Sequence, residues 1–251
     1  MKMKIAGIIP AREQSSRFPG KPLADICGRP MIWWVHRQCR KVEELDEVYV
    51  ATDSDKIYEC CRREGIEAIM TSPEHRTGTD RVGEAASKID ADLIVNIQGD
   101  EPLIEPDTIR AVIRPFLENP NLQVSSLMSR IEDPSEATNP NICKVVTASD
   151  GTALLISRAP VPYSKNGLTK DYHRALGIFG FRKEALRFFC EWGRKHGKGR
   201  IEAIEDIEML RLIEQGYRIH FSEVTTESLA VDTPEDLEKV IQRIKERNIT
   251  I

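Results

Sequence analysis

The six cysteines of this 251-residue sequence form no metal-binding pattern, and other common signals are missing as well. No C-x-x-C pair occurs, and no histidine stands near a cysteine at zinc-ligand spacing, which argues against a zinc site. No stretch approaches about 18 apolar residues, so no transmembrane helix is predicted. The N-terminus lacks the apolar run of a signal peptide. We therefore expect a soluble, cytoplasmic protein without membrane contacts, whose thiols stay reduced.

The sequence also lacks a surplus of positive charge. It has 36 Lys and Arg against 40 Asp and Glu, a net charge of −4. General nucleic-acid binding needs an excess of cations on one face, so we expect no nucleic-acid partner. A local cluster of cations for a small anion remains compatible with this balance. Hydrophobic residues make up 40% of the chain, which is enough to bury a core without help from disulfides or metals.

Short apolar runs alternate with segments of helical periodicity in the first half of the chain. This alternation is typical of a parallel sheet wrapped by helices. Thr79 is a candidate N-cap for the third of these helices. The predicted strands span 4–9, 47–52, 67–71 and 91–98, and the predicted helices span 29–42, 54–63, 78–89 and 105–119.

The pattern changes after about residue 120, where strand-like runs follow one another with few helices between them. We expect an antiparallel insertion at about 122–182 in a mostly parallel central sheet that is flanked by helices, an α/β fold. No linker or repeat divides the chain, so a single domain over 1–251 is predicted. Thr233 is a candidate N-cap with Pro234 at the first helical position. The later predicted helices span 183–196, 203–216 and 233–248, and a strand is predicted at 217–224.

A polar loop with three cations directly follows the first predicted strand. Ligands of open parallel sheets bind beyond the carboxyl ends of the strands, so this position favours a polyphosphate site. The loop matches neither G-x-x-x-x-G-K-[ST] nor G-x-G-x-x-G. A basic surface loop without function is the alternative. The loop residues in question are Arg12, Ser15, Ser16, Arg17, Gly20 and Lys21.

Two aspartates also follow apolar runs at predicted strand ends. Mg²⁺ binds carboxylates together with substrate phosphates and water, so Asp100 and Asp232 are candidate metal ligands although they are far apart in sequence. Asp232 alternatively caps the helix that begins near Thr233, and Asp100 alternatively starts a turn.

Residues 75–81, HRTGTDR, form a third polar segment. Gly78 and Thr79 enter a predicted helix, and Arg81 belongs to its first turn. The free N–H groups of a helix N-terminus can bind a base edge or a phosphate. A capped helix without any ligand is the alternative.

Taken together, these segments carry more information than each alone. The stretches IIPAREQSSRFPGKPLADICGRPMI, VATDSDKI, MTSPEHRTGTDRV, NIQGDEPLI, SRAPVPY and VDTPEDL resemble, in order and separation, those of the CMP-Kdo synthetases, the 3-deoxy-manno-octulosonate cytidylyltransferases. The resemblance covers about residues 4–242. It implies a nucleotidyltransferase-type fold and a cytoplasmic, Mg²⁺-dependent enzyme that is commonly a homodimer. Such enzymes couple CTP to a sugar acid, giving a CMP-sugar and pyrophosphate.

The resemblance also implies roles for individual residues. Lys21, Arg12 and Asp100 would carry the chemistry, and Gln98 would lie near both nucleotide and sugar. By the same likeness, the triphosphate loop comprises Arg12, Ser15, Ser16, Arg17 and Lys21, and the cytosine and ribose segment comprises Thr77, Gly78 and Arg81. The magnesium ligands would be Asp100 and Asp232. The sugar pocket would include Arg158, Glu202 and Glu205.

The acceptor half departs from the family pattern at three positions. Ala175, Phe179 and Met209 stand where the family usually has histidine, tyrosine and glutamine. His173 lies two residues before Ala175, on the same face of a strand but displaced by roughly 7 Å, and is the candidate substitute. These changes motivate the hypothesis that the acceptor is another sugar acid, such as 8-amino-Kdo. The alternative is that the altered pocket still takes Kdo.

Two other functions compete with this interpretation. A sugar-1-phosphate nucleotidyltransferase would carry a Gly-rich G-x-G-T-R-like opening loop, which the sequence lacks. A non-catalytic nucleotide-binding homologue would not need Asp100, Asp232 and Lys21 together. In the expected reaction, the anomeric hydroxyl of the acceptor attacks the α-phosphorus of CTP and pyrophosphate leaves, while cations stabilise the phosphate charge.

Overall fold

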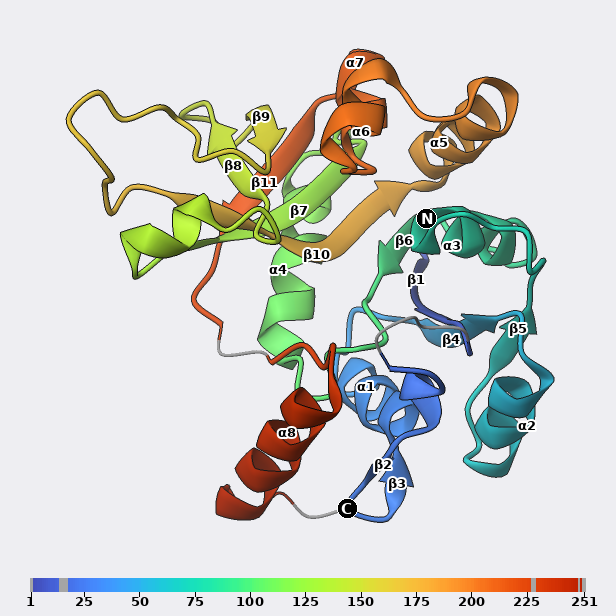
Figure 1. The fold of residues 1–251 in the computed structure, drawn as a ribbon. Coiled ribbons are helices and arrows are strands. Elements are labelled where there is room, and N and C mark those ends of the chain that lie inside the picture. Colours follow the sequence, from blue (N-terminus) through green and yellow to red (C-terminus); the bar gives the residue numbers. More distant parts are fainter. Residues whose placement is uncertain (1, 14–17, 227–228, 248, 250–251) are drawn as a thin grey trace. The chain divides into compact units, whose positions relative to one another are not determined.

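The computed structural model describes residues 2–13, 18–226, 229–247 and 249 (Figure 1). The chain divides into two compact units. Unit 1 comprises Met1–Arg110 and Glu227–Ile251, and unit 2 comprises Ala111–Thr226. Helix α4 (Pro106–Glu118) contains the boundary, so its sequence is shared by both units.

Unit 1 is built on four parallel strands in the order β6-β1-β4-β5. These are β1 (Ile5–Ala11), β4 (Glu47–Thr52), β5 (Ala68–Met70) and β6 (Leu93–Asn96). All four residues of β6 are buried, as expected for a parallel strand covered on both faces. The helices are α1 (Met31–Cys39), α2 (Asp55–Arg63), α3 (Gly78–Ser87) and α8 (Pro234–Glu246), and a short helix η1 (Lys21–Leu23) precedes the hairpin of β2 (Asp25–Ile26) and β3 (Arg29–Pro30).

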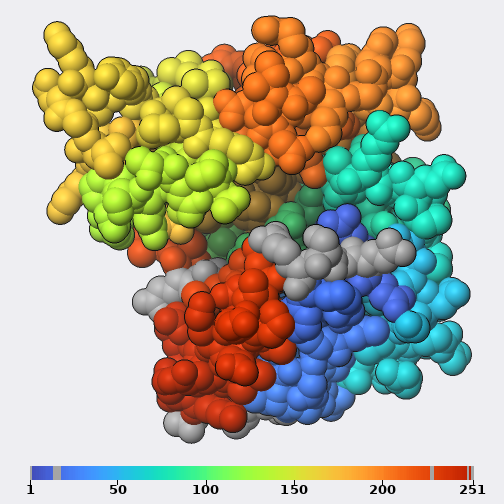
Figure 2. Space-filling view, viewed as in Figure 1, coloured from blue at the N-terminus to red at the C-terminus, as the bar shows by residue number. Residues whose placement is uncertain are grey.

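Helix α8 packs against helix α1. Val240 and Ile244 of α8 share an apolar cluster with Met31 and Trp34 of α1, and Val231 belongs to the same cluster. Figure 2 shows α8, in red, beside the N-terminal residues, in blue. Burying each large apolar side chain contributes about 1.5–3 kcal/mol. This cluster therefore fixes the segment just before α8 against the N-terminal part of unit 1.

Unit 2 contains five strands in the order β11-β7-β10-β8-β9. Only β11 and β7 pair in parallel, and the other pairs are antiparallel. The predicted α/β fold with an antiparallel portion is thus confirmed, whereas the predicted single domain stays a prediction. The elements are β7 (Val124–Arg130), η2 (Pro134–Thr138), β8 (Lys144–Thr147), β9 (Ala153–Ser157), β10 (His173–Arg182), α5 (Lys183–His196), α6 (Arg200–Glu205), α7 (Leu210–Glu214) and β11 (Ile219–Glu223).

The predicted N-cap of α3 is wrong by two residues. Thr77 has the extended backbone of a cap, and its Oγ1 accepts a hydrogen bond from the N–H of Asp80 at 3.0 Å. Thr79 lies inside the helix and is buried, where its Oγ1 accepts from Asn96 at 3.3 Å. The cap of α8 agrees with the prediction, because Thr233 accepts from the N–H of Asp236 and Pro234 follows it.

The predicted helix over 203–216 is two helices, α6 and α7, so that prediction is wrong. Asp206 ends α6 with a φ of 52°, in the left-handed region, and the chain then turns into α7. The last carbonyls of α6 have no partner within the helix and need donors from elsewhere. Arg158, a candidate site residue, donates hydrogen bonds to these carbonyls.

No helix in the described part of the chain has the length and apolarity that a membrane span requires. All six cysteines lie within the described ranges, and none is paired in a disulfide. Burial raises the pKa of the Cys61 thiol to about 12, so this thiol stays protonated at neutral pH.

Candidate functional site

Glu13 joins the two ends of the polar loop that follows β1. The Glu13 carbonyl accepts a hydrogen bond from the N–H of Gly20 at 3.0 Å, and its carboxylate accepts from Ser54 at 2.8 Å and pairs with Lys56. Gly20 has a φ of 70°, a conformation that glycine adopts without strain. Sequence reasoning missed Glu13, although a lone carboxylate among three cations was a usable signal. The two ends of the loop are therefore held together beyond β1.

The loop cations are only partly covered by the structure. Arg12 follows the last residue of β1 and is exposed. Ser15, Ser16 and Arg17, which were predicted to bind the triphosphate, lie outside the described residues. Lys21 is described and lies in η1.

Lys21, Asp100 and Asp232 converge within unit 1. The sequence predicted that the two aspartates bind one metal ion, and that role stays a prediction. The Lys21 ammonium donates to Asp100 Oδ2 at 2.9 Å and to the carbonyl of Val231 at 2.8 Å. It lies 3.5 Å from Asp232 Oδ1. The two aspartates are 132 positions apart in the chain, yet both reach one cation. The fold thus brings two carboxylates from distant parts of the sequence to the same positive charge.

Backbone contacts explain why these groups meet. The N–H of Val231 donates to the carbonyl of Asp100 at 2.8 Å, so the chain segments that carry both aspartates are joined. Asp100 lies in a turn shortly after β6, as one of the alternatives for it predicted. Asp232 does not cap α8, because Thr233 is the cap, so that alternative is wrong. The Asp232 carboxylate instead lies beside the Lys21 ammonium.

The two carboxylates have the chemistry of a magnesium site. Their oxygens already converge on a positive charge, that of the Lys21 ammonium. The side chains are 29% and 42% exposed, which leaves space for water and phosphate. Mg²⁺ commonly binds one or two carboxylates and takes water and substrate phosphate as its other ligands. Within the described residues no cluster of three or more His, Cys, Asp or Glu side chains could hold a metal.

Other predicted nucleotide residues lie at the same edge of the parallel sheet. Gln98 follows β6 by two residues and is half-buried. Gly78 is exposed at the first position of α3, directly after the cap Thr77. An alanine Cβ at Gly78 would lie 3.6 Å from Pro10 of β1, so the N-terminus of α3 approaches the carboxyl end of β1. The sheet therefore gathers these residues where its fold places ligands.

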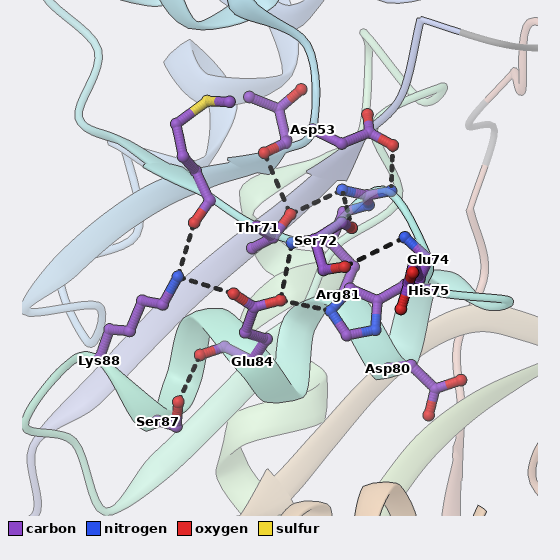
Figure 3. A network of polar contacts seen from close by, with 12 residues as sticks. Asp53, Thr71, Ser72, Glu74, His75, Asp80, Arg81, Glu84, Ser87 and Lys88 are labelled. Atoms are coloured by element: carbon purple, nitrogen blue, oxygen red, sulfur yellow. Dashed lines mark hydrogen bonds and ion pairs between the residues drawn. The ribbon is translucent and has the colours of Figure 1, made fainter. Parts of the chain in front are cut away.

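Arg81, which was predicted to contact the cytosine or ribose, is buried in a polar network (Figure 3). Its guanidinium donates to Asp53 Oδ2 at 2.7 Å and to Thr71 Oγ1 at 2.6 Å. A buried charge needs such partners to offset the loss of water. These contacts account for Arg81 as a support of α3, and its nucleotide contact stays a prediction.

Glu84 continues this network along α3 (Figure 3). Burial raises the pKa of its carboxyl, but hydrogen bonds from Lys88, from the N–H of Ser72 and from His75 outweigh that effect and lower the pKa to about 2. Because the folded pKa is below the ordinary value, these bonds stabilise the fold at neutral pH. The stabilisation is lost as the pH falls from about 4 toward 2. The network fastens α3 to the segment before it.

In unit 2 the structure brings Arg158 and Glu205 together. The Glu205 carboxylate accepts from Ser157 Oγ at 2.7 Å and from the N–H of Arg158 at 2.9 Å. The Arg158 guanidinium donates to the carbonyls of Glu205, Pro140 and Asp206, at 2.5, 2.8 and 2.9 Å respectively. Glu205 thus supports the arginine through its backbone and the end of α6.

Glu202 was predicted in the sugar pocket, and the structure places it in a buried ion pair. Its side chain is 1% exposed and that of Arg211 is 3% exposed. The carboxylate accepts from Arg211 NH2 at 2.6 Å and Nε at 2.9 Å, and from the N–H of Gly199 at 2.8 Å. The arginine also lies over the Phe189 ring at 4.0 Å. These contacts explain Glu202 structurally, and a contact with the acceptor stays a prediction.

His173, the candidate substitute for the missing histidine, begins β10. Its Nε2 lies 3.4 Å from Glu223 Oε1, which is longer than a normal charge-assisted hydrogen bond. Ala175 and Phe179 are half-buried on the same strand, and the register against β7 shifts between them. Met209 is buried. The described contacts place His173 with Glu223 and do not join it to Arg158.

The Glu202–Arg211 pair supplies a prediction for stability. Replacing Glu202 with glutamine leaves the buried guanidinium without its opposite charge, and breaking one partner of a buried pair costs about 3–5 kcal/mol. We expect E202Q to lower the free energy of unfolding by that amount in urea titrations. Arg218→Gln, which removes the exposed pair with Asp150 in the same unit, is the control and should change it by less than about 1 kcal/mol. Equal effects of the two variants would show that burial does not govern this pair.

The chain is similar to known proteins over nearly its whole length. The cytidylyltransferase family model matches residues 6–219. The chain is 43% identical to the 3-deoxy-manno-octulosonate cytidylyltransferase of Geobacter sulfurreducens, over 97% of this chain and 100% of the relative. It is 44% identical to the protein of that name from Syntrophus aciditrophicus, over 94% and 96%. The chain therefore belongs to the cytidylyltransferase family.

A solved structure agrees with this placement. The CMP:2-keto-3-deoxy-manno-octonic acid synthetase complexed with CTP has a TM-score of 0.91 to this chain, at 37% identity. The match covers 97% of this chain and 99% of the solved one. The nucleotidyltransferase-type fold expected from the sequence is thereby confirmed, and the protein is a nucleotidyltransferase enzyme.

Proposed function

We propose that the protein couples CTP to 3-deoxy-manno-octulosonate (Kdo), giving CMP-Kdo and pyrophosphate. The observation that carries this proposal is likeness over nearly the whole chain to proteins of that name and to a synthetase structure that holds CTP. Neither a sugar-1-phosphate nucleotidyltransferase nor a non-catalytic nucleotide-binding homologue has comparable support.

Within unit 1, the chemistry rests on phosphate binding at the end of β1 and β6. Arg12 and Lys21 bind and orient the triphosphate so that the α-phosphorus can be attacked. The anomeric oxygen of the acceptor forms a bond to that phosphorus while the bond to the pyrophosphate oxygen breaks, and the hydroxyl proton passes to solvent. Gln98 and the N-terminus of α3 at Thr77 and Gly78 hold the nucleoside.

Magnesium is the cofactor that fits this arrangement. Asp100 and Asp232 would hold the ion, since their oxygens already converge on the Lys21 ammonium. When bound, Mg²⁺ supplies positive charge to the phosphate oxygens during the transfer. Lys21 adds a further positive charge that the protein itself provides.

The position of Asp100 in this site depends on Gly99, which stands just before it. An added Cβ would lie 2.8 Å from the backbone carbonyl of Pro10, which cannot turn away as a flexible side chain would. We expect G99A to move the turn that carries Asp100 and to lower kcat/KM for pyrophosphate release by roughly tenfold or more. Thermal unfolding, measured in parallel, separates this effect from loss of fold. Wild-type activity in a folded G99A protein would mean that the turn adapts.

The acceptor side is assigned to Arg158, whose guanidinium suits the carboxylate of a sugar acid. The departures at Ala175, Phe179 and Met209 leave 8-amino-Kdo or another acid as the second candidate acceptor. Met209 is buried, so that position adds apolar packing rather than a hydrogen bond. The relatives' names favour Kdo.

The test is pyrophosphate release from CTP and Mg²⁺ with a panel of acceptors. Kdo, 8-amino-Kdo, other ulosonic acids and a blank without acceptor form the panel, with CMP-sugar formation followed by mass spectrometry. Turnover of Kdo at least as efficient as that of any other acid supports the proposal. Silence with Kdo beside release with another acid would reassign the acceptor. CTP binding without any release would favour the non-catalytic alternative.

We also propose that the protein forms a homodimer, as the family resemblance implies. The support on this chain is the exposed apolar surface of β9 in unit 2, where Leu154 is 62% and Leu155 39% exposed. Light scattering coupled to gel filtration measures the mass directly, and a monomeric mass at micromolar concentration would refute this part of the proposal.

A further inference from the structure

Lys144 of β8 is fully buried, and its positive charge has no use in the reaction described above. Its relative exposure is 0%. Among the described residues, its hydrogen-bond partners are backbone carbonyls, and the Glu205 carboxylate acts on it only through the electrostatic field. Lysine is rarely buried without a partner, so the position of this charge needs a reason.

Three backbone carbonyls surround the Lys144 ammonium. It donates to Asn139 at 3.0 Å, to Ile142 at 2.6 Å and to Arg158 at 2.5 Å. An ammonium has three N–H groups, so all of its donors are used by these bonds. Burial lowers the pKa of Lys144 below its ordinary value. The side chain thus joins the turn at 139–142 to the end of β9.

Arg158 binds the same turn through its guanidinium. Its NH1 donates to the carbonyl of Pro140, which lies between the two turn carbonyls that Lys144 holds. Its Nε and NH2 donate to the carbonyls of Glu205 and Asp206 at the end of α6. The turn, the end of α6 and the Arg158 backbone are therefore fixed by one connected set of bonds.

The guanidinium still has donors for a ligand. Arginine carries five N–H groups, and these three bonds use one each on Nε, NH1 and NH2. One N–H on each terminal nitrogen is not used by them. N–H groups of a guanidinium that is held in place can bind a carboxylate with charge-assisted hydrogen bonds.

We propose that Lys144 is a positioning residue for the acceptor, because it holds the Arg158 backbone and the 139–142 turn so that the guanidinium presents its remaining N–H groups to a carboxylate. This inference rests on the proposed function, in which Arg158 binds the sugar acid. Lys144 itself does not contact the acceptor, since its three donors face backbone carbonyls. Its effect should therefore appear in acceptor binding and leave CTP binding unchanged.

The experiment compares Lys144→Met with Val145→Ala, a buried residue next to it on β8. Both substitutions weaken the same strand, but only the first removes the ammonium from Arg158. We expect K144M to raise KM for the acceptor by about tenfold or more, with KM for CTP within about twofold of wild type. V145A should lower the melting temperature and leave both KM values near wild type.

A second readout separates positioning from a general structural role. Wild type and K144M are each assayed with the acid acceptor and with its methyl ester, which lacks the carboxylate charge. The quantity compared is the ester penalty, the factor by which kcat/KM falls when the methyl ester replaces the acid. If Lys144 aligns Arg158 with the carboxylate, this factor is large in wild type and about tenfold smaller in K144M. Should K144M fail to fold, Lys144→Gln, which keeps two N–H donors, takes its place with a smaller expected change.

The outcomes are distinct. An unchanged acceptor KM in folded K144M, an equal rise in V145A, or an ester penalty as large as in wild type would overturn the positioning role and leave the proposed function intact. Absence of turnover by the wild-type protein with every acid would overturn the proposed function, and the inference with it.

Discussion

Replacing Asp100 with asparagine is expected to lower the rate of pyrophosphate release from CTP by roughly 100-fold or more. Asp100 and Asp232 are the two carboxylates that converge on one cation in unit 1. Asparagine keeps the shape and one neutral oxygen but removes the charge that a hard divalent cation prefers. The apparent Mg²⁺ requirement should therefore rise together with the fall in rate. Steady-state assays across a Mg²⁺ series measure both.

Asp232→Asn should act in the same direction and Asp107→Asn should not. Asp107 belongs to the same unit, but its side chain is 89% exposed and pairs with Arg110. If the two site aspartates share one ion, the double variant should be little worse than either single one, because neighbouring sites are not additive. If the D100N enzyme keeps the wild-type rate and Mg²⁺ dependence, Asp100 is not a metal ligand.

Sequence patterns predicted the elements of the parallel part of the fold well, because its strands are short apolar runs with clear boundaries. The predicted strand at 47–52 agrees with β4 residue for residue, and in unit 2 the predicted helix at 183–196 agrees with α5 in the same way. The helix at 203–216 was wrong since its break depends on tertiary contacts. The carbonyls at Glu205 and Asp206 are taken by Arg158, which is some 47 positions earlier in the chain.

The candidate site shows the same limit. Charge and position after a strand were enough to select Lys21, Asp100 and Asp232, whose convergence follows from the edge where parallel strands end. Nothing in the local sequence distinguishes a ligand-binding charge from a buried supporting one. Arg81 and Glu202 match the family motifs, yet in the structure their charges are paired with Asp53 and Arg211. Burial of a long charged side chain depends on partners that only the fold brings near.

Replacing Lys21 with methionine is expected to have two opposite effects. The rate of pyrophosphate release should fall by roughly 100-fold or more, because a positive charge on the triphosphate is lost. Divalent-ion binding without nucleotide should become tighter, because the ammonium that now contacts Asp100 and approaches Asp232 competes for their oxygens. At a separation of about 4 Å, two unit charges interact by about 4 kcal/mol near a protein surface, so a tenfold fall in the dissociation constant is a modest expectation.

Mn²⁺ binding followed by electron paramagnetic resonance in the absence of CTP measures the second effect directly. Lys21→Arg keeps the charge and should leave Mn²⁺ binding weak, while Lys4→Met removes a lysine that pairs with Glu47 elsewhere in unit 1 and should change neither quantity. Since loss of fold weakens metal binding and activity together, only a true competitor gives tighter binding with lower activity. Unchanged Mn²⁺ affinity in K21M would show that the ammonium does not compete with the ion. A wild-type release rate would remove Lys21 from triphosphate binding. Because K21M is expected to raise the Mn²⁺ affinity and lower the release rate, the two measurements test separately whether Lys21 pairs with the carboxylates and whether it binds the phosphates.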